Sequence, residues 1–229
     1  MNDVQDVCVS RPMRRWLSVW FATLLIAFAL DGAAAHWSQP VAQRVKHSEV
    51  SEELKEAGHI GSVLVIAAFV YVLHESRGRG VALLLGSAVA CGLFYTIVRW
   101  TVGRTRPVVR IKPYHFEPFA NGLEGFLHAH NMSFPSGHVC LAFATAACLA
   151  HLLPRGRWLF FGIAAALAAQ RVLELAHYPS DVVAAAGLGV LAFAVTRRAQ
   201  EALLARRPHR LTGPSAAAPT APAGSSVNA

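Results

Sequence analysis

Long apolar runs alternate with short polar segments along most of this chain. Several of the runs are shorter than the roughly 20 residues that cross a hydrocarbon core, so their polar ends must complete the crossing or pack against other helices. The pattern predicts an all-α fold, a six-span transmembrane helical bundle over residues 16–198. Its predicted spans are residues 16–35, 57–74, 81–98, 136–153, 158–173 and 182–196.

The segments that flank the first run leave two alternatives open. Arginines precede this run and Ala33, Ala34 and Ala35 end it, as in a cleaved signal peptide, but its length favours a retained span. Residues 36–56 place apolar positions at near-helical spacing among charges, which fits a helix at the membrane surface or a solvated loop equally well.

From Pro208 onward Pro, Ala, Ser and Gly prevail, so residues 199–229 are predicted to be a largely disordered tail.

Composition supports an integral membrane protein. The chain is 54% hydrophobic and 15% charged, with a mean hydropathy of +0.40, which is too apolar for a typical soluble domain. The net charge of +8 could indicate nucleic acid, but the basic residues lie in clusters beside the apolar runs, so the expected partner is the lipid bilayer and not nucleic acid. Once the candidate site arginines are set aside, basic residues are more numerous on the side of both termini. We therefore expect an inner-membrane protein whose N-terminal residues 1–15 and tail are cytoplasmic.

Three polar clusters interrupt the apolar pattern. The first follows the third run, the second begins the fourth run, and the third lies between the fifth and sixth runs. Because successive spans alternate in direction, all three meet at one face, which the orientation makes extracytoplasmic. Arginines and histidines from these clusters predict a phosphate site. The clusters are Arg99 with Arg106-Pro107, Pro135-Ser136-Gly137-His138, and Arg171 with His177 and Asp181.

The spacing within the first two clusters suits phosphate binding. Arg99 and Arg106 are seven residues apart, so they would share a helix face if the third helix continued that far. The alternative is that they anchor the span at the interface. Ser136 and Gly137 would occupy the first turn of a helix, where free amides favour an anion; the alternative is an ordinary helix cap.

The third cluster offers a nucleophile. Asp181 follows His177 by four residues, so its carboxylate could accept a hydrogen bond from one ring nitrogen and leave the other oriented for attack. A histidine and an aspartate at a membrane edge could instead be capping or interfacial groups.

Together these clusters resemble the motifs of the type 2 phosphatidic acid phosphatase superfamily, lipid phosphate phosphatases that share a fold with vanadium haloperoxidases. The first motif, Lys, six residues, then Arg-Pro, has Arg99 in place of Lys. The second, Pro-Ser-Gly-His, is intact at residues 135–138. The third, Ser-Arg, five residues, His, three residues, Asp, has Gln170 in place of Ser. Arg99 keeps the positive charge, and the Gln170 amide can still donate a hydrogen bond as a possible substrate contact.

The resemblance implies a mechanism and a substrate class. His177 would attack phosphorus to give a phosphohistidine, Asp181 would orient its ring, and His138 would protonate the leaving oxygen and then activate water. Charge on the phosphoryl oxygens would be stabilised by a set comprising Arg99, Arg106, Arg171 and the amides near Ser136 and Gly137. No metal or other cofactor is required.

The substrate would be a lipid phosphomonoester or diphosphate, such as phosphatidic acid, phosphatidylglycerol phosphate, undecaprenyl diphosphate or a phosphate of lipid A. Alternatives are a lipid phosphotransferase of the same fold, and a non-catalytic lipid-binding protein or transporter. The chain shows no internal repeat of the kind that many transporters carry.

The remaining cysteines and polar residues are not predicted to take part in the chemistry. No cysteine pair suggests a disulfide or a metal site. His128 and His130 could bind a metal, but a polar loop that shapes the entrance is favoured. Asp31 and Glu174 could bind substrate, but solvation at the membrane interface is favoured. No pattern indicates an oligomeric state.

Overall fold

The structure, a computed structural model, describes residues 11–75, 77–107, 112–119, 122, 126 and 131–206, with side chains from residue 15 onward. The predictions for residues 1–10, for His128 and His130 and for the tail beyond residue 206 lie outside the described residues.

Helices make up nearly all of the described chain. Two isolated bridges, Arg104 with Phe116 and Thr105 with Met132, are the only β-pairings in the described residues, so the all-α prediction is confirmed. The elements are α1 Arg11–Lys46, α2 Glu49–Ala57, α3 Ile60–Leu73, α4 Arg77–Val102, α6 Gly137–Leu152, the 3₁₀ turn η1 Pro154–Gly156, α7 Arg157–Leu173 and α8 Pro179–Ala205.

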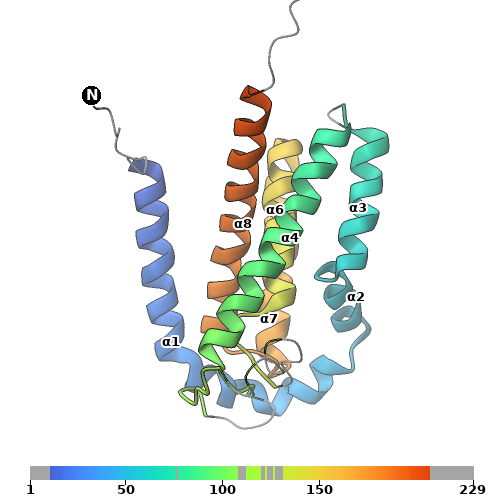
Figure 1. Cartoon of the computed structure of the whole chain (residues 1–229). Helices are drawn as coiled ribbons and strands as arrows, with labels where there is room; N and C mark the ends of the chain where they lie inside the picture. Colours follow the sequence, from blue (N-terminus) through green and yellow to red (C-terminus); the bar gives the residue numbers. More distant parts are fainter. Residues whose placement is uncertain are drawn as a thin grey trace, which may run out of the picture.

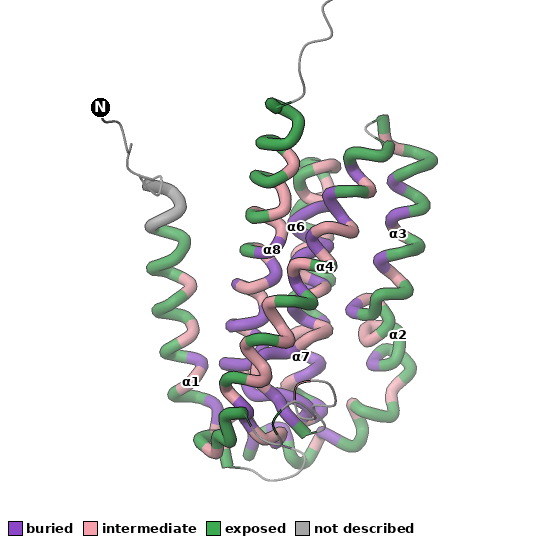
Figure 2. Tube along the Cα trace, viewed as in Figure 1, coloured by how far each residue is buried: buried purple, intermediate pink, exposed green. Residues whose placement is uncertain are grey.

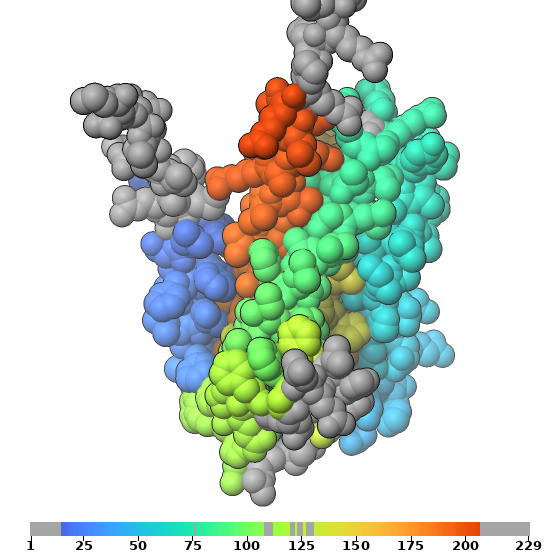
Figure 3. Space-filling view, viewed as in Figure 1, coloured from blue at the N-terminus to red at the C-terminus, as the bar shows by residue number. Residues whose placement is uncertain are grey.

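Helix α6 is the centre of the bundle. It packs against α4, α7 and α8, while α4 also contacts α3 and α8 (Figure 1). Figure 2 shows buried residues concentrated on α6, α7 and α8. Small residues permit this close packing: a Cβ atom on Gly189 of α8 would lie 2.3 Å from the carbonyl oxygen of Cys140 on α6. Figure 3 shows α4 crossing the face between α8 and α3.

The helices support a multi-pass membrane protein. Three of those described are long and apolar enough to span, namely α1 from Arg15, α4 and α8, and the α2–α3 pair, bent by 62°, would supply a fourth. Helix α6 is apolar but has 16 residues, about 24 Å of helix against a core of about 30 Å. The six-span count therefore is not confirmed by length and composition, and it stays a prediction.

Several boundaries differ from the sequence expectation. Helix α1 continues through Pro40 to Lys46, and a separate helix α2, N-capped by Ser48, follows it, so residues 36–56 are neither one surface helix nor a plain loop. Ala57, the predicted start of the second span, ends α2. Helix α8 runs to Ala205, past the domain end predicted at residue 198, because residues 197–205 keep good helix formers.

The cysteines also differ from expectation. Cys91 of α4 and Cys140 of α6 form a disulfide, with Cα atoms 6.4 Å apart, whereas Cys148 is free and buried. The two paired cysteines are separated by 49 residues inside apolar helices. Only helix packing brings them together, so their spacing in the sequence gave no signal.

The helix termini lie in two groups, one at each end of the bundle. The start of α1, the end of α3 and the end of α8 lie at one end (Figure 1). The end of α4, the start of α6, the end of α7 and the start of α8 lie at the other. The three polar clusters border these last four helix ends, so they meet as the alternation of spans predicts.

Candidate active site

Two adjoining cavities lie at the cluster-bearing end of the bundle. The first, of about 360 Å³, is lined by Arg106, His138 and His177 together with less polar residues of the α2–α3 corner, α4 and α6: Gly58, His59, Ile60, Ala88, Cys91, Gly92, Tyr95, Gly137 and Leu141. The second, of about 290 Å³, shares Arg106 and His138 and adds Lys46, Lys55, Arg171, Glu174 and Ala176. All three predicted clusters thus contribute to one site.

His177 is held in the turn between α7 and α8. Its backbone N–H donates to the carbonyl of Arg171 over 3.1 Å, which ties the two predicted residues together. Its Nδ1 lies 2.7 Å from the carbonyl oxygen of Ser133 and 3.7 Å from Oδ2 of Asp181. Nδ1 therefore carries the proton and donates to Ser133, while Asp181 stands at ion-pair distance. This geometry leaves Nε2 with its lone pair.

Burial controls the charge of His177. The side chain is 3% exposed, and its burial lowers the pKa of His177 from the ordinary value of 6.5. Asp181 opposes this shift in pKa, and the positive charges of Arg106 and Arg171 add to it. A lowered pKa keeps the imidazole neutral near pH 7, which is the form that can act as a nucleophile.

Two buried donors near the cavities have no partner among the described residues: Oγ of Ser136 and Nε of Arg171. Ser136 is the N-cap of α6, yet its side chain makes no capping hydrogen bond. At Gly137 a Cβ atom would lie 3.1 Å from the Tyr95 ring, so a residue without a side chain lets α4 approach this helix start. Unpartnered donors beside a helix N-terminus are what a bound anion would satisfy.

Arg171 is positioned by a buried carboxylate that was expected to be solvated. Glu174 is 7% exposed and accepts hydrogen bonds from Nη1 of Arg171 and, over 2.6 Å, from Nε2 of Gln170. Gln170 also donates to Ser51 of α2 over 2.6 Å. The amide N–H groups of Gln170 therefore face Glu174 and Ser51, and the possible substrate contact of Gln170 stays a prediction. The prediction for Glu174 was wrong because α2 covers the end of α7.

Arg104 is a functional candidate that the sequence pattern did not single out. Its guanidinium is fully buried and donates to Oδ2 of Asp31 over 2.6 Å and to Oδ1 of Asp181 over 2.7 Å. Nη1 also donates to Oγ of Ser180 over 2.7 Å, and the ring of Tyr178 lies 4.1 Å from the guanidinium carbon. Arg104 thereby fixes the carboxylate that faces His177.

The expectation for Asp31 was also wrong. Asp31 of α1 is fully buried, and its carboxylate accepts hydrogen bonds from the backbone N–H and the hydroxyl of Ser180 over 2.9 and 2.6 Å. An aspartate inside an apolar run was the available signal, because a charge in such a position is usually paired with another group inside the bundle.

The first cluster is organised differently from a continued helix. Helix α4 ends at Val102, and Gly103, with φ of 60°, turns the chain. Arg106 consequently lies outside the helix and reaches both cavities, with Nε donating to the carbonyl of Met132 over 3.1 Å. Arg99 remains in α4, where it donates to the Tyr95 hydroxyl over 3.1 Å and to the carbonyl of Phe126 over 2.9 Å. The shared helix face was therefore a wrong expectation, and Arg99 meets the site through Tyr95.

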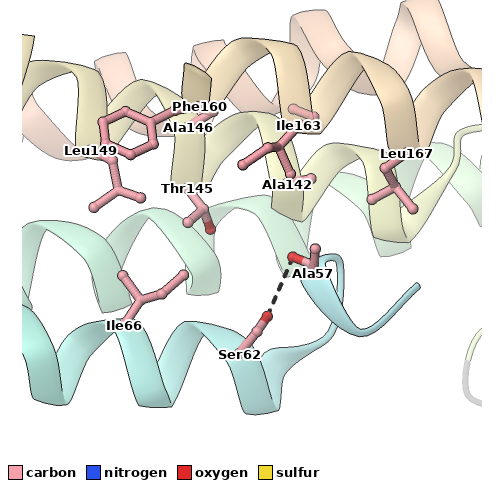
Figure 4. A pocket seen from close by; sticks show the side chains of 11 residues that line it. Ala57, Ser62, Ile66, Ala142, Thr145, Ala146, Leu149, Phe160, Ile163 and Leu167 are labelled. Atoms are coloured by element: carbon pink, nitrogen blue, oxygen red, sulfur yellow. Dashed lines mark hydrogen bonds between the residues drawn. The ribbon is translucent and has the colours of Figure 1, made fainter. Parts of the chain in front are cut away.

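A separate apolar cavity of about 230 Å³ lies between α3, α6 and α7. Figure 4 shows its lining, with Ser62 of α3 donating to the carbonyl of Ala57 over 3.3 Å. The single hydroxyl hydrogen of Ser62 is shared with the carbonyl of His59, which lies closer, at 2.7 Å. These two bonds brace the corner between α2 and α3, which borders the first polar cavity.

Arginines, a helix N-terminus and a neutral buried histidine at one end of a multi-pass helical bundle define the class of membrane phosphatases. Residues 80–204 match the PAP2 superfamily, and the chain belongs to that superfamily. A lipid A 1-phosphatase of Rhizobium etli is 29% identical over 200 residues, covering 78% of this chain and 82% of the relative. A lipid A 1-phosphatase of Rhizobium johnstonii is 30% identical over 202 residues, covering 79% of each.

Solved structures show the same fold. LpxE of Aquifex aeolicus gives a TM-score of 0.52 with 16% identity, covering 70% of this chain and 94% of that one. A transmembrane PAP2 type phosphatidylglycerolphosphate phosphatase of Bacillus subtilis gives 0.58 with 19% identity, covering 81% and 96%. The protein is a membrane lipid phosphatase.

Proposed function

We propose that this phosphatase removes the 1-phosphate of lipid A through a phosphohistidine intermediate. The observation that carries the chemistry is the pair of unpartnered buried donors, Ser136 Oγ and Arg171 Nε, beside cavities that contain His138 and His177. The substrate is supported by the two relatives named for that activity. Lys46 and Lys55 of the second cavity suit an anionic headgroup.

In the first chemical step, Nε2 of His177 attacks phosphorus, so an N–P bond forms and the bond to the lipid oxygen breaks. The leaving oxygen takes a proton from His138. In the second step His138 removes a proton from water, whose oxygen attacks phosphorus and releases phosphate from His177. Ser133 and Asp181 hold Nδ1 of His177 and stabilise its positive charge during both steps.

Charge on the phosphoryl oxygens is stabilised by Arg106, Arg171 and the amides at the start of α6. Ser136 donates its unpartnered hydroxyl. Arg99 adds a positive charge from behind Tyr95, whose ring it covers at 4.9 Å. In this proposal these groups perform the neutralisation that other phosphatases obtain from metal ions, so the reaction needs no metal or other cofactor.

The site is proposed to face the extracytoplasmic side of the inner membrane, with both termini in the cytoplasm. The distribution of arginines supports this orientation, and the start of α1 and the end of α8 lie at the end of the bundle opposite the site (Figure 1). The helical membrane domain then includes α8 to Ala205. A reporter that is active only outside the cytoplasm should be inactive when it is fused after Ala205. An active fusion would show that the orientation is the opposite of the proposed one.

The experiment is a phosphate-release assay with purified protein in detergent and EDTA. The substrates are lipid A, phosphatidic acid, phosphatidylglycerol phosphate and undecaprenyl diphosphate. We expect release from the 1-position of lipid A, complete loss in His177→Asn, and wild-type rates in His36→Ala, which changes an exposed histidine of α1. Release of phosphate only from a lipid other than lipid A would refute the proposed substrate. Transfer of labelled phosphate to a second lipid would indicate a phosphotransferase, and activity abolished by EDTA would refute the role given to the arginines.

A further inference from the structure

The corner between α2 and α3 is pressed onto the start of α6. It consists of Gly58 and His59, between Ala57 and Ile60. A Cβ atom on Gly58 would lie 2.9 Å from Cβ of His138 and 3.0 Å from its carbonyl oxygen. Only glycine allows this approach, and the hydrogen bonds of Ser62 brace the corner. The backbone thus fixes His59 beside His138.

The two imidazoles face each other edge to face. Nε2 of His59 lies 3.2 Å from Nε2 of His138, and the ring centroids are 4.8 Å apart at an interplanar angle of 73°. Two lone pairs or two N–H groups would repel each other at this distance, so one nitrogen carries a proton that the other accepts. Both residues line the first cavity with Arg106 and His177.

We propose that His59 is a positioning residue that stabilises the protonated form of His138. This inference rests on the proposed function, because His138 must be protonated to release the lipid oxygen. A cationic His138 donates from Nε2 to the lone pair of His59, which leaves Nδ1 for the substrate. The arrangement parallels His177, whose Nδ1 is held by Ser133 and whose Nε2 is left for attack.

The proton balance closes over one turnover. Nδ1 of His138 gives a proton to the leaving lipid oxygen, and the ring becomes neutral. The same nitrogen then takes a proton from the attacking water, which restores the cation as phosphate leaves. His59 accepts the Nε2 hydrogen bond throughout.

A neutral acceptor suits this position because the surroundings of His138 are rich in positive charge. The titratable and charged groups facing the site from the packed elements are His59, Lys46, Lys55, Tyr95, Arg106, Arg171, His177 and the carboxylate of Glu174. Most of these groups are positively charged and disfavour a protonated His138. The hydrogen bond that neutral His59 accepts is therefore the direct contact that stabilises the protonated form of His138. Glu174 is engaged by Arg171 and Gln170.

The test is the pH dependence of kcat for lipid phosphate hydrolysis in wild type, His59→Ala, His59→Gln and Gly58→Ala. In His59→Ala the protonated form of His138 loses its acceptor. We expect the alkaline limb to move down by about one pH unit and the rate at pH 8 to fall about tenfold, since a hydrogen bond to a charged group contributes at least that factor. Gln retains an acceptor oxygen, so His59→Gln should return the limb toward its wild-type position.

Gly58→Ala should displace the corner and reproduce the shift, which keeps the test decisive if His59→Ala does not fold. His36→Ala is the matched control for loss of an exposed histidine. An unchanged profile, or an equal loss at every pH, in both His59→Ala and Gly58→Ala would refute the positioning role of His59 while leaving the phosphatase intact. A wild-type protein that releases no phosphate from any lipid of the panel would refute the proposed function and the positioning role together.

Discussion

Arg104 is the residue whose removal should disturb the molecule most. It stands between two carboxylates, Asp31 and Asp181, and all three side chains are fully buried. The group has one positive and two negative charges, so Arg104→Met leaves two buried carboxylates without a cation. Removing one partner of a buried ion pair costs about 3–5 kcal/mol. Asp31→Asn instead leaves a matched pair of Arg104 and Asp181, and we expect a loss of only about 1–2 kcal/mol.

These energies predict separable shifts in thermal stability. For a chain of this size about 1 kcal/mol corresponds to roughly 2–4 °C. Arg104→Met should therefore unfold about 6–20 °C below wild type, and Asp31→Asn about 2–8 °C below. In the double variant only one unpaired carboxylate remains, so its loss should be smaller than the sum of the single losses by about 1–3 kcal/mol.

The measurement is the temperature of half-unfolding in detergent at one fixed heating rate, together with phosphate release at 25 °C. Arg104→Met should also lose most activity, because Asp181 is no longer fixed beside His177, whereas Asp31→Asn should retain much of it. Arg155→Met, which changes an exposed arginine at η1, is the matched control. The reasoning is refuted if Asp31→Asn destabilises as much as Arg104→Met, or if the two losses simply add.

Two further predictions concern the nucleophile and the turn that precedes Arg104. Because burial lowers the pKa of His177 from the ordinary value of 6.5, the midpoint of its titration should lie below pH 6.5. Labelled-histidine NMR with His177→Asn for assignment checks this, and titration at or above pH 6.5 would contradict it. Gly103 has φ of 60°, and a Cβ atom there would lie 1.9 Å from the carbonyl oxygen of Glu117. Gly103→Ala should abolish activity and lower thermal stability, whereas Gly61→Ala, at an open position of α3, should do neither.

The meeting of the three clusters could be predicted because each borders the end of an apolar run. Alternation of spans then decides the side, and no tertiary detail is needed. The boundaries were less predictable: Arg99 and Arg106 would share a helix face only if the third helix continued that far, but α4 ends at Val102 and Gly103, with a positive φ, turns the chain between them. The sequence alone allows Gly103 to lie inside a helix or just after its end. The contact of this turn with Glu117, which only the tertiary structure shows, places Gly103 after the end of α4.

The partners of the catalytic groups could not be predicted, because they come from distant segments. Asp31 and Arg104 are separated by 73 positions, and His59 and His138 by 79. A hydrogen bond over such a separation depends on how the helices pack, which local periodicity does not predict. Asp31 carried a partial signal as a charge within an apolar run. His59, an exposed histidine at a helix break, carried none.

The proposed mechanism gives the N-terminal third of the chain a specific part. The superfamily match begins at residue 80, yet Asp31 of α1, Ser51 of α2 and His59 of the α2–α3 corner make hydrogen bonds to the candidate site and its supporting residues. Lys46 and Lys55 add the charge of the second cavity. In the proposed mechanism, residues 80–204 carry the groups that contact phosphate, whereas α1 and α2 hold those groups in place and supply charge beside the headgroup. We expect differences in substrate among related phosphatases to arise mainly from this N-terminal region.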